Sequence, residues 1–71
     1  MASGVQVNDV VAMRRNDDRF DIVRIDPRGH TVLKGSVAAK DAEARTLELA
    51  KVHDGDAWVE EYGGEVRCLN V

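Results

Sequence analysis

The stretch DVVAMRRNDDRFDIVRID, residues 9–26, decides the fold, because it predicts a β-hairpin with two apolar faces. Two runs rich in β-formers flank an Asn-Asp-Asp turn. A two-residue loop at residues 17–18 would pair Arg14 with Asp21, Ala12 with Val23 and Val10 with Ile25 on one face, and Arg15 with Phe20, Met13 with Ile22 and Val11 with Arg24 on the other. A solvated face would alternate with polar residues, so both faces are expected to be covered.

A turn, a third strand and a helix follow the hairpin. The DPRG sequence at residues 26–29 suits a type I turn, and HTVLKG predicts a short strand over residues 30–35. From about Ala39 to His53 the apolar spacing becomes helical, and Gly55 is the expected C-terminal cap. One face of that helix collects Ala38, Ala42, Thr46, Leu49, Val52 and His53, with Ala39 and Ala50 at its margin.

The stretch DAWVEEYGGEVRCLN, residues 56–70, predicts a second hairpin, because a Gly63-Gly64 pair suits a two-residue turn. That turn would pair Tyr62 with Glu65, Glu60 with Arg67 and Trp58 with Leu69. The inner face, toward the helix, would then hold Ala57, Val59, Val66 and Cys68. Trp58, Tyr62 and Leu69 would lie on the face away from the helix.

These segments predict an α+β fold, an antiparallel β-sheet with one α-helix packed on one face, in the order ββ-β-α-ββ. With 71 residues the chain has room for a single domain, residues 1–71, and residues 1–8 are expected to be flexible. A single core of this size rarely supplies more than roughly 3–5 kcal/mol of stability. Self-association is one way to add to it, since a lone cysteine allows no internal disulfide.

The composition predicts a cytoplasmic protein. Cys68 is the only cysteine, and a lone thiol suits a reducing compartment. The first nine residues lack the basic and apolar regions of a signal peptide, and no apolar run is long enough to span a membrane. The formal net charge is −3, divided between +2 over residues 1–40 and −5 over residues 41–71. The acidic half argues against a protein that coats nucleic acid as a whole.

No catalytic, cofactor or metal site is expected, and no small-molecule substrate. Cys68 and His53 both fall on inward faces, but Cys68 alternates with Val66 in a strand, where cysteine packs as a small hydrophobe. The histidines and Cys68 lack the close spacing of zinc ligands. Strands flank the Gly63-Gly64 pair on both sides, whereas a phosphate loop lies between a strand and a helix.

Five arginines gather on the first hairpin and its exit: Arg14, Arg15, Arg19, Arg24 and Arg28. A β-ribbon can enter a DNA groove and read bases or phosphates through such side chains. Aspartates at positions 17, 18, 21 and 26 are interleaved with them and would neutralise much of the field. A nucleic-acid-contact module is therefore the alternative hypothesis, and a solvated, internally paired face is the simpler one.

From Val10 to Val71 the pattern resembles small uncharacterised bacterial domains with a hairpin, a strand, an Ala/Glu-rich helix and a glycine hairpin. The residues that carry the resemblance are RFDIV, EARTLELAK and EYGGEV, with Phe20 where tryptophan is expected. The stretches VQVNDVV and IVRIDPRG are also similar to the start of SH3-like barrels, from which the long helix departs. Neither resemblance implies an activity.

The sequence favours a small non-catalytic protein-binding module. Large aromatics on a polar face are typical of an interface anchor with a polar rim. The expected contact residues are Trp58, Tyr62, Leu69, Val10, Val23 and Ile25, on the sheet face away from the helix. They would bind a second copy, as a homodimer, or a protein partner, in the manner of an adaptor or of an acidic inhibitor of a host or phage nucleic-acid machine. Packing of the two aromatics into the monomer's own core stays an open alternative.

Overall fold

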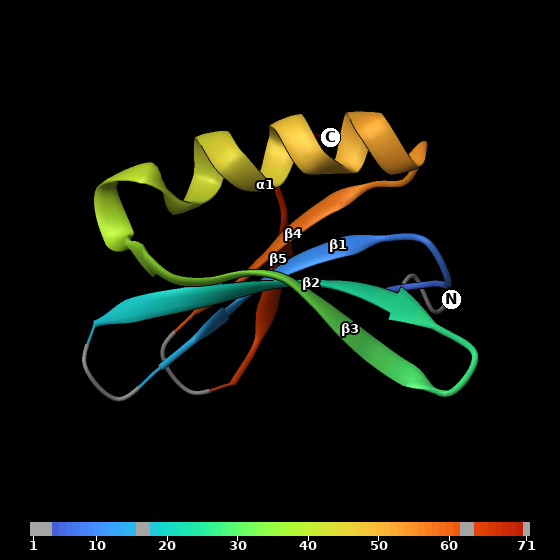
Figure 1. Ribbon diagram of the computed structural model, residues 1–71, viewed down its shortest axis with the longest axis horizontal. Helices are drawn as coiled ribbons and strands as arrows, with labels where there is room; N and C mark the ends of the chain where they lie inside the picture. The colour runs from blue at the N-terminus through green and yellow to red at the C-terminus, as the bar shows by residue number, and fades with distance from the viewer. Residues whose placement is uncertain (1–3, 16–17, 62–63, 71) are drawn as a thin grey trace.

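The computed structural model describes residues 4–15, 18–61 and 64–70 (Figure 1). Its elements follow the predicted order, and the α+β class with one helix is confirmed. They are β1 (Val10–Arg14), β2 (Arg19–Asp26), β3 (Gly29–Ala38), α1 (Ala39–His53), β4 (Ala57–Glu60) and β5 (Val66–Cys68). The helix bounds agree with the periodicity of the sequence.

The five strands form one mixed sheet in the order β3-β2-β1-β4-β5. The prediction of a purely antiparallel sheet is wrong, because β1 and β4 are parallel, with Val10 beside Ala57 and Ala12 beside Val59. The cause is the connection through the helix: α1 carries the chain back across the sheet, so β4 starts at the same end as β3 and β1. The sheet ends in two different edge strands, β3 and β5, and α1 lies across one face (Figure 1).

The predicted register of the first hairpin is wrong by one residue. Val10 pairs with Arg24, Ala12 with Ile22 and Arg14 with Phe20. The Arg15 N–H donates to the Arg19 carbonyl at 2.7 Å, which leaves three residues in the loop in place of two. Asp18, the last of them, has a φ of 64°, and a left-handed residue at this place is usual in three-residue hairpin loops. Because side chains alternate between faces, the slip of one residue changes which residues share a face.

The predicted register of the second hairpin is also wrong by one residue. The Glu61 N–H donates to the Glu65 carbonyl at 2.7 Å, and Gly64 has a φ of 87°. Trp58 therefore pairs with Cys68 and not with Leu69. Tyr62 and Gly63 lie outside the described residues. In this register Val66 and Cys68 share the side of Trp58, and Leu69 packs on the helix side.

The main core lies between α1 and the sheet. Its buried residues are Val10, Ala12, Phe20, Ile22, Val37, Ala42, Ala50, Ala57 and Val59, with Leu33, Leu49 and Leu69 packed against them. The helix contributes small residues at a spacing of four, Ala42, Thr46 and Ala50, and the Thr46 hydroxyl donates to the Ala42 carbonyl at 2.6 Å. Val52, expected on the buried face, is 72% exposed. Small residues on α1 let the helix lie close to the sheet.

The helix ends at Asp54 in place of Gly55. Asp54 adopts the left-handed conformation, with a φ of 60°, and the Gly55 N–H donates to the Ala50 carbonyl at 3.0 Å. Glycine is required at position 55 for close packing, because a Cβ atom there would lie 2.1 Å from the Asn8 carbonyl oxygen. The chain before β1 and the chain after α1 thus touch backbone to backbone. In the described chain the helix is too short and too polar to cross a membrane.

Candidate functional site

The sheet face away from α1, called the far face below, carries a second apolar layer. Its residues are Val11, Met13, Val23, Ile25, Trp58, Glu60, Val66 and Cys68, which alternate with the residues of the main core. Val11 and Val23 are only 5% and 1% exposed, although no helix of the described chain lies on this side. The hairpin is therefore apolar on both sides, as its sequence predicts.

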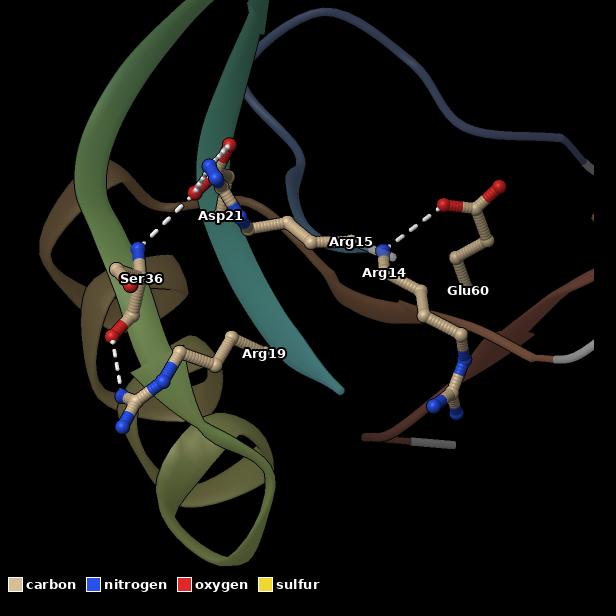
Figure 2. Close-up of polar contacts among 6 residues, drawn as sticks. All are labelled: Arg14, Arg15, Arg19, Asp21, Ser36 and Glu60. Carbon is tan, nitrogen blue, oxygen red and sulfur yellow. Dashed lines mark hydrogen bonds and ion pairs between the residues drawn. The ribbon is translucent and has the colours of Figure 1, made fainter. Parts of the chain in front are cut away.

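A groove of about 200 Å³ opens on the far face. Its walls are the apolar side chains of Val5, Val11, Met13, Ile25 and Val66, and its polar rim consists of His30 and Glu60. Glu60 is held in place because one of its carboxylate oxygens accepts the Arg14 backbone N–H at 3.0 Å (Figure 2). An apolar floor with a polar rim is the usual anatomy of a protein contact surface.

A second depression, of about 560 Å³, surrounds Trp58 on the same face. Gly4, Gln6, Asp9, Asp56, Val66 and Cys68 line it together with the indole. Val66 belongs to both depressions, so the two are neighbours on the far face.

Trp58 is half-buried, and Asp9 fixes its orientation. The Asp9 side chain is 6% exposed, and its Oδ2 atom accepts the Trp58 indole N–H at 3.0 Å and the Gln6 N–H at 2.9 Å. The Oδ1 atom accepts the Asp56 N–H at 3.0 Å. One buried carboxylate thus connects the chain before β1, the entry to β4 and the only tryptophan. Trp58 is part of the monomer's own framework and also lines the far face.

The structure brings together only part of the predicted contact set. Trp58, Val23 and Ile25 lie on the far face. Val10 is fully buried on the helix side, and Leu69 packs against that same core, so the expected placement of these two is wrong. Tyr62 lies outside the described residues.

Of the groove residues, the predicted contact set contains only Ile25. Three of the others, all in strands, are absent from it because the predicted hairpin registers place them on the helix side. Val11 and Met13 belong to the far face once the first loop has three residues, and Val66 belongs to it once the second does. The sequence does contain a signal, an Asp at position 18 and a Gly at position 64, because these residue types tolerate the left-handed conformation that ends a three-residue loop.

Asp21 holds an irregular stretch at the β2–β3 edge (Figure 2). The pairing of β2 with β3 shifts twice around Ile22, and Ser36 takes a φ of 56°. The Asp21 Oδ1 atom accepts the Ser36 N–H at 3.0 Å, and Arg15 Nη1 donates to both carboxylate oxygens at 3.2 and 3.1 Å. The Ser36 N–H and then Arg15 hold the pKa of Asp21 below its ordinary value of 3.8.

Acidification is expected to destabilise the protein below about pH 4. The folded pKa of Asp21 is lowered, as is that of Asp26, which accepts the Thr31 hydroxyl and the Arg28 N–H. The stability that these two carboxylates contribute is therefore fully present above their ordinary pKa of 3.8, and it is lost as the pH falls through their lower pKa values in the folded protein. Urea unfolding at pH 7 and at lower pH measures it. The double variant D21N/D26N should lose part of this pH dependence, and an unchanged dependence would contradict the assignment.

The guanidinium groups of four hairpin arginines bind other residues of the chain, namely Arg14, Arg15, Arg19 and Arg24. Figure 2 shows the first three pointing in different directions. The Arg14 guanidinium lies 4.7 Å from the centre of the Phe20 ring and pairs with Asp18, whereas Arg15 binds Asp21. Arg19 donates to the Ser36 carbonyl at 3.0 Å, and Arg24 to the Asn8 side chain at 3.3 Å. Arg28 donates its backbone N–H to Asp26 at 2.9 Å. Nucleic-acid contact stays a prediction, which the salt dependence of binding would test.

Cys68 and His53 do not meet. The Cys68 thiol lies on the far face beside Trp58 and donates to the Asn70 side chain at 3.3 Å, whereas His53 ends the helix on the opposite side. The expected packing of Cys68 into the core under the helix is wrong, because the second hairpin has the other register. Among the described residues no three His, Cys, Asp or Glu side chains come together as metal ligands would.

Comparison of the chain with models of known protein families, with curated proteins and with solved structures finds no match.

Proposed function

We propose that the protein is a non-catalytic protein-binding module, of adaptor or inhibitor type, that contacts a second copy of itself through the far face. The observation that carries the proposal is the apolar groove between Val11, Met13, Ile25 and Val66 with its polar rim. An apolar floor surrounded by polar groups is typical of an interaction site. The half-buried, rigidly held Trp58 beside it is a residue type enriched at the energetic centres of interfaces.

A second copy fits this face because of the strand order. β1 is the middle strand of the sheet. Two sheets can therefore face each other across a two-fold axis that runs parallel to β1. In that arrangement the β3–β2 half of one copy lies over the β4–β5 half of the other. His30, on the β3 side of the groove, then faces the side that carries Glu60 in the other copy. Two-fold dimers are also the commonest assembly.

Dimerisation also offsets the small size of the main core. Ala42, Ala50, Ala57 and Ala12 make up much of that core, and each buries little apolar surface. Burying the far face would remove further apolar area from water at about 25 cal/mol per Å², before the cost of association. The far face would then be the second half of a shared core.

The rim offers a charge-reversal test. H30E would add a second carboxylate to the rim that already carries Glu60, so a dimer would bring like charges of both copies together around the groove. The dissociation constant of the dimer should rise roughly fivefold, because exposed charge pairs contribute up to about 1 kcal/mol. E60Q keeps the oxygen that accepts the Arg14 N–H and removes the charge, so H30E/E60Q should recover most of the affinity. Analytical ultracentrifugation gives the dissociation constants. Equal constants for all three proteins would contradict this arrangement.

A further inference from the structure

The residues Gly4–Gln6 form a segment, called the strap below, that separates the two depressions of the far face. Val5 is a wall of the apolar groove, whereas its neighbours Gly4 and Gln6 line the depression around Trp58. Val66 lines both from below. The strap is therefore what divides one apolar surface into two.

The strap is held by few contacts. Gln6 is tied to Asp9 twice: its N–H donates to the Asp9 carboxylate at 2.9 Å, and its carbonyl accepts the Asp9 N–H at 3.0 Å. Gly4 and Val5 make no backbone hydrogen bond to other described residues. The chain joins the sheet only from Asn8, whose N–H donates to the Ile25 carbonyl at 2.9 Å. Asn8 also has a φ of 79°, so the chain bends between the strap and β1. The half-buried Val5 side chain is the main apolar contact of the strap.

We infer that the strap is a displaceable cover of the far face, which competes with the partner for the apolar surface between the groove and Trp58. The inference rests on the proposed function for the identity of the competitor, but displacement of the strap is a property of the monomer. When the strap leaves, the groove and the depression around Trp58 become continuous over Val66, and the Cys68 thiol becomes more accessible. Binding of a second copy then requires the strap to move aside.

The test uses Cys68, the only cysteine, as a native reporter. V5D in the full-length chain places a charge against the apolar groove and should drive the strap into solvent. Labelling of the thiol by a disulfide reagent should become about three- to tenfold faster. This is the factor by which losing the half-burial of one valine side chain should shift the equilibrium toward the displaced strap. V7D is the matched control, because Val7 is already 53% exposed and is two residues away. Its labelling rate should equal that of the wild type.

Labelling is measured at about 1 μM, where a weak dimer is dissociated by mass action, so the result reports the monomer. Equal labelling of V5D and the wild type would overturn the inference. So would loss of the helix signal in circular dichroism, because Val5 would then belong to a core that the fold requires. Faster labelling of V5D with no dimer at any concentration would support the displaceable strap and refute the proposed function. Faster labelling of V5D together with tighter self-association would support both.

Discussion

Replacement of Asp9 by alanine is expected to lower the free energy of unfolding by about 3–4 kcal/mol. The N–H groups that would lose their acceptor are partly buried, and a hydrogen bond to a charged group contributes about 1.5–3 kcal/mol. Three donors lose their acceptor together: the Gln6 N–H, the Asp56 N–H and the Trp58 indole N–H. A domain of this size has only roughly 3–5 kcal/mol to lose, so much of the D9A protein should be unfolded at 25 °C. Urea unfolding followed by circular dichroism measures the change.

The matched control is D41A, which removes an exposed carboxylate from the first turn of α1. Its cost should stay near 0.5 kcal/mol, roughly the contribution of an exposed charge near a helix N-terminus. D9N should fall between the two, because it keeps one oxygen acceptor and loses the charge. If D9A costs no more than D41A, the carboxylate does not hold the chain before β1, the entry to β4 and Trp58 together.

The second large effect is expected from G55A, at about 3 kcal/mol, the upper part of the usual range for overpacked sites. The added Cβ would lie 2.1 Å from the Asn8 carbonyl oxygen and 2.7 Å from its carbon. Both atoms belong to the backbone, so no side-chain rotation relieves the contact. The end of α1 and the start of β1 would have to separate, which also loosens the strap next to Asn8.

G35A is the control for the chemical change itself. A Cβ on Gly35 would meet only the Asp21 Oδ1 atom, at 3.6 Å, an ordinary van der Waals distance. Its effect on the free energy of unfolding, measured in urea, should be within about 1 kcal/mol of zero, because an unstrained Gly→Ala change acts mainly through the unfolded chain. Equal midpoints for G55A and G35A would show that the backbone contact at Asn8 yields without cost.

The sequence predicts the elements well and their faces less well, for a local reason. The helix Ala39–His53 has a clear periodicity and an ending near Gly55, so both of its bounds could be predicted. The side of each strand depends on the register, and the register depends on one residue in each loop. In β1 the alternation of apolar and polar residues does not determine which side faces the helix, because Val10 and Val11 are both apolar and belong to opposite faces.

The candidate site shows the same dependence. The sequence places Trp58 on the far face, where the structure has it, because Ala57 and Val59 beside it in β4 mark the helix side without reference to a partner strand. Cys68 and Leu69 exchanged sides, because their placement rested on a two-residue turn at Gly63-Gly64. The local sequence does not predict the parallel pairing of β1 with β4, because this pairing depends on the position in the sheet at which the chain re-enters after α1.

Sedimentation equilibrium of the wild type beside V66D and V52D tests the central claim, that the far face binds a second copy, most directly. Val66 is 42% exposed in the groove, and Val52 is 72% exposed on the helix, so the two variants add the same charge to different surfaces. We expect the wild type and V52D to approach twice the monomer mass of 7.8 kDa as the concentration rises. V66D should remain a monomer with its helix signal intact, up to about 100 μM. A wild type that stays at 7.8 kDa throughout, or a V66D protein that dimerises as the wild type does, would contradict the account.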